Sequence, residues 1–111
     1  MLKRVKRRYL AIEIDADAVF SSKEFVDAVW AAILKLYGEY GGSMVGLTLI
    51  DFEKEKGFAV IRVMLTALEV VRTALVSITK IGDRPVAVHV LKVSGTLKAL
   101  YKNVAKHPRS V

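Results

Sequence analysis

The sequence predicts an α+β fold in which two helices cover one face of a four-stranded antiparallel sheet and a third helix follows the last strand. Four segments alternate apolar and polar residues, which is typical of half-buried strands. Three other segments repeat apolar residues at spacings of three and four, as amphipathic helices do. A length of 111 residues suffices for one domain with its own core, but not for two.

The first two predicted elements are a strand and a helix. Residues 8–14 alternate, with Leu10, Ile12 and Ile14 on one face and Tyr9, Ala11 and Glu13 on the other. Ser21 and Glu24 have the spacing of a capping box, which satisfies the first unpaired amides of a helix. The apolar spacing then continues to Tyr40, and the glycines at 41–42 are expected to end this helix.

The middle of the chain predicts two strands and a second helix. The strands cover residues 44–52 and 57–64 and are joined by a charged turn. Thr66 and Glu69 have the spacing of a second capping box, and the helix behind them is expected to reach Ile81. The core-facing strand residues are expected to be Val45, Leu47, Leu49, Ala59, Ile61 and Val63.

A turn at residues 82–85 leads into the fourth strand, whose core face is Val86, Val88 and Val90. The last helix is expected from residue 94 to about 103. The order of strands and helices is the split βαβ pattern of the ferredoxin-like fold, in an RRM-like arrangement. The second face of this sheet is too apolar to be fully exposed to water, so the last helix or a partner should cover part of it. The residues of this face are Tyr9, Ala11, Thr48, Ile50, Phe58, Val60, Arg62, Ala87, His89 and Leu91.

We expect a basic arm at residues 1–7, one domain at 8–103 and a basic tail at 104–111. The chain has no cysteine, which excludes disulfides and thiolate metal sites and fits a cytoplasmic location. The basic start is not followed by a long apolar run, so no signal peptide is expected. The longest uncharged stretch, residues 40–50, is too short to span a membrane.

Positive charge is concentrated at the two ends of the chain. Residues 1–8 contain five basic residues and residues 84–111 contain six, with no acidic residue in either segment. Residues 9–83 contain seven basic and eleven acidic residues, and the formal net charge of the chain is +7. This segregation indicates a protein that meets a polyanion, most simply a nucleic acid, with one side only.

Two segments resemble nucleic-acid-binding patterns. Residues 56–59 match the start of the RNA-recognition signature, but Val60 and Val63 replace its later aromatics, so core packing competes with base stacking. Ser94, Gly95 and Thr96 precede a helix and suit a phosphate, although the same residues also make a plain helix cap. The candidate RNA contacts are Lys3, Arg4, Lys6, Arg7, Arg8, Lys92, Ser94, Gly95, Thr96, Lys98 and Lys102.

Residues for catalysis are sparse, and we expect no catalytic residue and no metal site. Glu13, Asp15 and Asp17 alternate and suggest a Mg²⁺ site, but acidic residues at this spacing also solvate the end of a strand. His89 and His107 are far apart in the sequence, and neither is close to a nucleophile. Acylphosphatases share the predicted fold, but their arginine-bearing phosphate loop is absent, since residues 15–20 are acidic.

One segment of the chain is distinctive: Val93-Ser94-Gly95-Thr96-Leu97-Lys98-Ala99-Leu100. It occurs together with Arg8-Tyr9-Leu10, Ala28-Val29-Trp30, Gly38-Glu39-Tyr40-Gly41, residues 57–62 and Ala74-Leu75 with Ile78 and Ile81. In this order the segments resemble the ribonuclease P protein component 2 family of archaea and eukaryotes, and the first segment is the most specific.

The resemblance implies a non-catalytic, RNA-binding subunit of an endoribonuclease that removes the 5′ leader of precursor tRNA. It further implies that the ribonuclease P RNA performs the hydrolysis with Mg²⁺, while the protein binds no cofactor. A TIM-barrel protein subunit is the implied partner, typically in a two-plus-two assembly, so the chain is expected to self-associate within that assembly. The basic arm and the Ser-Gly-Thr helix are then the RNA contacts, and the apolar surfaces are protein interfaces.

Three other hypotheses remain open at the level of sequence. A ribosomal or other ribonucleoprotein subunit would show the same charge pattern. A regulatory ferredoxin-like module for a small ligand would need an apolar pocket. A metal-dependent nuclease would use Glu13, Asp15 and Asp17.

Overall fold

The computed structural model describes residues 6–38 and 45–105. The main sheet contains β1, β2, β3 and β6, and a short hairpin contains β4 and β5. Short 3₁₀ turns follow β2 and β3. The bounds are β1 Arg7–Asp15, α1 Ser22–Tyr37, β2 Thr48–Glu53, a turn at Lys54–Lys56, β3 Phe58–Met64, a turn at Leu65–Ala67, α3 Leu68–Ser77, β4 Lys80–Ile81, β5 Arg84–Pro85, β6 Ala87–Ser94 and α4 Leu97–Ala105.

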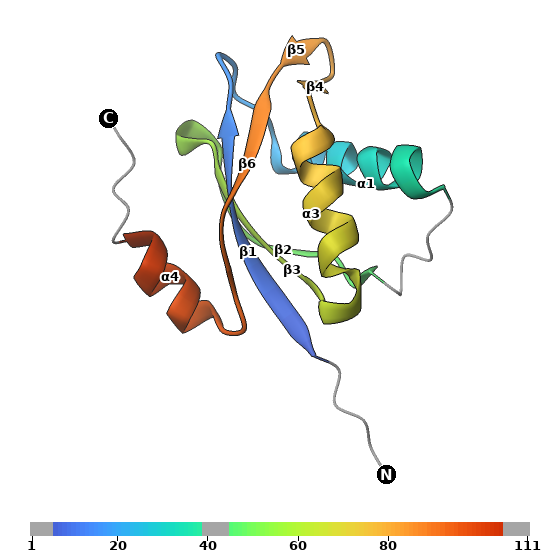
Figure 1. The fold of residues 1–111 in the computed structure, drawn as a ribbon. Coiled ribbons are helices and arrows are strands. Elements are labelled where there is room, and N and C mark those ends of the chain that lie inside the picture. Colours follow the sequence, from blue (N-terminus) through green and yellow to red (C-terminus); the bar gives the residue numbers. More distant parts are fainter. Residues whose placement is uncertain (1–5, 39–44, 106–111) are drawn as a thin grey trace.

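The sheet has the strand order β2-β3-β1-β6, and all neighbouring strands are antiparallel. Helices α1 and α3 lie on one face of this sheet, and α4 lies on the opposite face (Figure 1). The sheet order and the two connecting helices confirm the predicted ferredoxin-like fold. None of the helices in residues 6–38 and 45–105 is long and apolar enough to cross a bilayer.

The main core lies between the sheet and helices α1 and α3. Leu10, Phe25 and Leu75 are among its fully buried side chains, and the rings of Phe25 and Phe52 are 5.8 Å apart. A second, smaller cluster lies on the other face of the sheet, where α4 covers the strands. Its buried members are Ala11, Phe58, Val60 and Leu100, with Tyr9, Ile50 and Leu97 partly buried around them.

Helix α1 begins as predicted but ends earlier. The Ser21 hydroxyl accepts from the Glu24 amide at 3.1 Å, and the Glu24 carboxylate accepts from the Ser21 amide at 2.9 Å, which confirms the first capping box. The helix ends at Tyr37, because Gly38 adopts a positive φ of 69° and its amide donates to the carbonyl of Leu34. The predicted end at Tyr40 was wrong, and the glycines at 41–42 lie outside the described residues.

Helix α3 differs from its prediction at both ends. The second capping box was wrong: Ala67 occupies the cap position, and a 3₁₀ turn at Leu65–Ala67 leads directly into the helix, so the Thr66 side chain is not used as a cap. The helix ends at Ser77 rather than at Ile81, and the Ser77 hydroxyl donates to a carbonyl of the last turn at 2.7 Å. The residues beyond it form the β4–β5 hairpin around Gly82, whose φ is 64°.

The second strand starts later than predicted. Val45 is fully buried but lies in a helical turn, and Gly46 has a φ of 60°, so β2 begins only at Thr48. The register then shifts between Leu49 and Asp51, which leaves Ile50 as an extra residue between the Leu49–Ile61 and Asp51–Val60 pairs. Despite the later start of β2 and its bulge, the apolar residues predicted for this strand pack against the main core or against the smaller cluster beneath α4.

Candidate nucleic-acid interface

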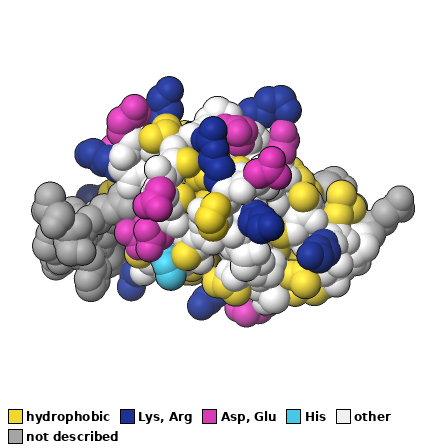
Figure 2. Space-filling model, turned by 90° about the horizontal axis from the view of Figure 1, so that it is seen from above, with side chains coloured by type: hydrophobic (Ala, Val, Ile, Leu, Met, Phe, Trp, Pro, Cys, Tyr) yellow, Lys and Arg dark blue, Asp and Glu magenta, His cyan; other side chains and the backbone are white. Residues whose placement is uncertain are grey.

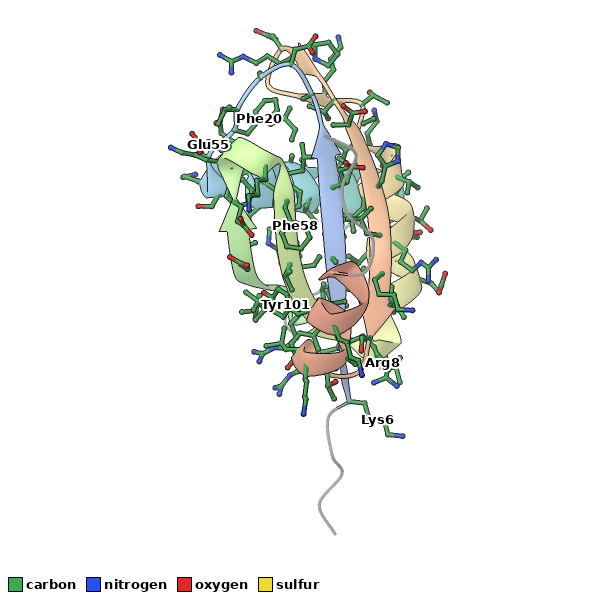
Figure 3. The ribbon with its side chains drawn as sticks, turned by 90° about the vertical axis from the view of Figure 1, so that its left-hand side faces the viewer. Lys6, Arg8, Phe20, Glu55, Phe58 and Tyr101 are labelled. Carbon is green, nitrogen blue, oxygen red and sulfur yellow. The ribbon has the colours of Figure 1, made fainter. Side chains whose placement is uncertain are left out.

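The two basic segments of the sequence meet at one end of the sheet. Strands β1 and β6 are antiparallel, with Tyr9 opposite Ser94. A Cβ atom placed on Gly95 would lie 3.7 Å from Arg8 Nη1, so the Arg8 guanidinium lies beside the turn that precedes α4. Figure 3 shows Lys6 and Arg8 near this turn and far from Glu55, which lies at the other end of the sheet. The fold therefore joins the start and the end of the described chain in one surface.

The two ends of the sheet differ in charge. Residues 6–10 and 92–102, which form much of the first end, contain no acidic residue. We call this first end the basic end; its cationic side chains are Lys6, Arg7, Arg8, Lys92, Lys98 and Lys102. The opposite end contains Glu13, Asp15, Asp17, Glu53 and Glu55 together with a few lysines. Figure 2 shows acidic and basic side chains mixed on the surface at this opposite end.

A β-bulge determines how β6 presents its lysine. Ala11 is opposite Lys92 and Ile12 is opposite Val90, so Leu91 is an extra residue between the two pairs. Lys92 therefore lies opposite Ala11, beside the bulged residue Leu91, which is 40% exposed.

The Ser-Gly-Thr turn makes the local hydrogen bonds of a helix cap. The Thr96 hydroxyl accepts from the amide of Ala99 at 3.2 Å, and the Ser94 hydroxyl accepts from the amide of Thr96 at 3.3 Å. The capping alternative is thus what the structure shows, and α4 starts at Leu97 rather than at residue 94. A hydroxyl that accepts a hydrogen bond keeps its own proton to donate, so these residues can still bind an anion.

Helix α4 covers the centre of the second sheet face. The sequence predicted that either the last helix or a partner would do so. Leu100 is fully buried against this face, and the Tyr101 hydroxyl donates to the Asp51 carboxylate at 3.2 Å. Partial burial and the negative charges of Asp51 and Glu53 raise the pKa of Tyr101. Because Phe58 is only 6% exposed, its ring has no open face for a base, and the packing alternative for the RNA-recognition-like segment is supported.

The three alternating carboxylates line a shallow depression instead of converging on one point. Glu13 and Asp15 are on the last part of β1, and Asp17 is in the loop that follows. Lys54 and Lys56 line the same depression. Within residues 6–38 and 45–105, no three histidine or acidic side chains are grouped so that they could hold a metal ion.

Two of the sequence-predicted contacts, Lys3 and Arg4, lie outside the described residues. Arg62 was expected on the second sheet face but was not predicted as a contact. It is half-buried on β3 opposite Tyr9, and its Nε atom is buried without a hydrogen-bond partner in the described structure. Alternation predicts the face on which Arg62 lies, but only tertiary structure reveals the missing partner.

Comparison with known proteins agrees with this fold. A chain in the cryo-EM structure of yeast ribonuclease MRP has the same fold, with a TM-score of 0.71, 14% sequence identity, and coverage of 96% of this chain and 94% of that one.

Closer relatives are ribonuclease P protein component 2 of Pyrococcus horikoshii and of Thermococcus kodakarensis. They are 32% and 33% identical over 97 residues, which cover 87% of this chain and 81% of each relative. The sequence model of the Rpp14/Pop5 family matches residues 8–105. These matches span nearly all of the described domain, and the chain therefore belongs to the Rpp14/Pop5 family.

Proposed function

We propose that this chain is an RNA-binding protein subunit of ribonuclease P, which supports the enzyme's RNA in removing the 5′ leader from precursor tRNA. One structural observation supports the proposal beyond family membership: the basic start of β1 and the basic segment from Lys92 to Lys102 lie at the same end of the sheet. A surface of this kind neutralises phosphates and positions RNA strands without reading sequence.

The protein's own residues have a binding role in this proposal. Arg7, Arg8, Lys92, Lys98 and Lys102 contact phosphates, and the Ser94 and Thr96 hydroxyls donate to them while capping α4. Hydrolysis uses Mg²⁺ that the RNA holds through its own phosphate oxygens. The protein then lowers repulsion between RNA strands and contributes no group to the reaction.

The test is a reconstitution with precursor tRNA as substrate. We expect no cleavage by the isolated protein at any Mg²⁺ concentration. When added with its protein partner to the ribonuclease P RNA, it should raise the rate and lower the Mg²⁺ concentration required. Substituting Glu13→Gln, Asp15→Asn and Asp17→Asn together should leave this stimulation intact. A triple variant that folds and assembles but loses all activity would contradict the non-catalytic role.

The protein partner is proposed to be a TIM-barrel subunit, in a two-plus-two assembly that also brings two copies of this chain together. The support is exposed apolar surface on the helical layer: Leu34, Leu36 and Tyr37 on α1 are 54%, 44% and 41% exposed, and Val76 on α3 is 61% exposed. We expect the isolated chain to self-associate and the partner to solubilise it. A monomer at high concentration that gains nothing from the partner contradicts this assignment. We also propose a cytoplasmic location, where the cysteine-free sequence meets no redox constraint.

A further inference from the structure

Arg62 is a charged residue on a sheet face that is otherwise largely apolar. It lies on β3, between β1 and β2, with Tyr9 opposite on one side and Thr48 on the other. Its neighbours at alternate positions, Phe58 and Val60, are buried in the cluster beneath α4. Arg62 therefore lies on the same sheet face as α4, on the inner strand β3.

The guanidinium of Arg62 is incompletely satisfied. Its Nε atom is buried, and neither a hydrogen bond nor an ion pair to Arg62 is found within residues 6–38 and 45–105. A buried polar group without a partner costs about 1–3 kcal/mol, and native structures rarely retain one without a reason. The side chain is thus positioned for a hydrogen-bond acceptor that the described chain does not supply.

A second arginine lies beside it. Arg7 is opposite Met64 on β3, which makes Arg7 and Arg62 diagonal neighbours on the same face, roughly 7–8 Å apart. Arg7 is exposed and likewise makes no ion pair in the part of the chain that the structure describes. At this spacing one anion can lie between the two guanidinium groups and compensate both charges. Guanidinium groups match the geometry of phosphate, which they bind through two parallel hydrogen bonds.

The surroundings favour a nucleic-acid phosphate over the carboxylate of a partner protein. Lys6 and Arg8 flank Arg7 in the sequence, and the Lys6 carbonyl accepts from the amide of Leu65 at 2.8 Å, which fixes this segment beside the end of β3. One carboxylate would compensate one arginine, whereas a chain of phosphates compensates the whole group of cations. We propose that Arg62 and Arg7 together form a phosphate-binding site for RNA on the α4 face of the sheet, an inference that rests on the proposed RNA-binding function.

The experiment compares Arg62→Met with Arg72→Met in the full chain, using ribonuclease P RNA as the probe. Arg72 is exposed on α3, on the opposite side of the sheet, so its loss is the same change in charge and size at a different place. We expect Arg62→Met to lower RNA affinity roughly tenfold or more and to reduce the slope of log K against log salt by about 1. Arg72→Met should change both by much less. Arg62→Lys keeps the charge but loses the two-pronged geometry, and it should also bind RNA more weakly.

Stability separates a binding role from a structural one. Because Arg62→Met replaces an unsatisfied nitrogen by an apolar side chain of similar size, the melting temperature should stay the same or rise. The site is contradicted if Arg62→Met and Arg62→Lys bind RNA as the wild type does. It is also contradicted if weaker binding merely follows a loss of folding, or if only binding to a protein partner is lost. A wild-type chain that does not bind the RNA at all contradicts the proposed function itself.

Discussion

Replacing Leu100 by alanine should detach α4 from the sheet. The Leu100 side chain is fully buried against Ala11, Phe58 and Val60. Truncating a buried leucine to alanine costs about 2–5 kcal/mol. Helix α4 has nine residues, and an isolated helix shorter than roughly 12–15 residues is marginal in water, so its stability must come from packing. We therefore expect most molecules of Leu100→Ala to have α4 undocked while the main core stays folded.

Two measurements together detect this outcome. Hydrogen exchange should show that the amides of α4 lose protection while those of β1 and α1 keep theirs. Urea unfolding, followed by the fluorescence of Trp30, reports the main core, because Trp30 packs against it from α1. We expect the free energy of unfolding to fall by about 2–3 kcal/mol, limited by the docking free energy of α4. The control is Leu36→Ala, a residue 44% exposed on α1, which should change stability by less than about 0.5 kcal/mol.

The expected result can fail in two ways. If the α4 amides of Leu100→Ala keep wild-type protection, the apolar contact does not hold the helix. If the whole domain unfolds in one step with α4 and the sheet losing protection together, α4 is part of the main cooperative unit and not a separate cover. Either result refutes the description of α4 as a cover held mainly by Leu100.

Other predictions follow from single contacts. Tyr101→Phe removes the hydrogen bond to Asp51 and should weaken the docking of α4 by about 1 kcal/mol. Because the folded state raises the pKa of Tyr101, the wild type should keep this contribution below pH ~10 and lose it as the pH rises further. Hydrogen exchange of the α4 amides should show this loss in the wild type and not in the variant. Gly57→Ala should lower the free energy of unfolding by more than Gly82→Ala in urea titrations. Both glycines have a positive φ, but only the Cβ at Gly57 would meet the carbonyl oxygen of Ile14. Neutralising the arm by Lys3→Gln, Arg4→Gln, Lys6→Gln and Arg7→Gln should lower the salt slope of RNA binding by roughly 3, and an unchanged slope would show that the arm does not contact RNA.

The sequence predicted the sheet and its helices because alternation and three-to-four spacing report local burial directly. It did not predict where the helices end. Gly38 and Gly41 are both plausible ends for α1 from the sequence, and the structure shows Gly38 as the cap. The predicted capping box of Thr66 and Glu69 was also wrong. A 3₁₀ turn leads the chain into α3, so the two residues have the spacing of a capping box but Thr66 does not cap the helix.

The candidate site was predictable only in part. The pairing of the two basic segments follows from the antiparallel arrangement of the first and last strands of the predicted sheet. The bulge that moves Lys92 opposite Ala11 has no sequence signal, because its register is set by packing on both faces. Arg62 was not among the predicted contacts, because its unsatisfied nitrogen is defined by the groups around it, which alternation does not reveal. The first strand also begins one residue earlier than predicted, since Arg7 already pairs with Met64 in β1.

The most direct test of the basic end is a comparison of two charge reversals at several salt concentrations. Lys98 lies in the first turn of α4 beside the Ser-Gly-Thr turn, whereas Lys35 is exposed on α1, on the opposite side of the sheet. Both variants change the net charge equally, so bulk electrostatics alone would weaken binding to ribonuclease P RNA equally. We predict that Lys98→Glu weakens binding clearly more than Lys35→Glu and lowers the salt slope by about 0.7–0.9 for the phosphate contact that is lost. Equal losses and equal slopes for the two variants would contradict a localised RNA interface at the basic end.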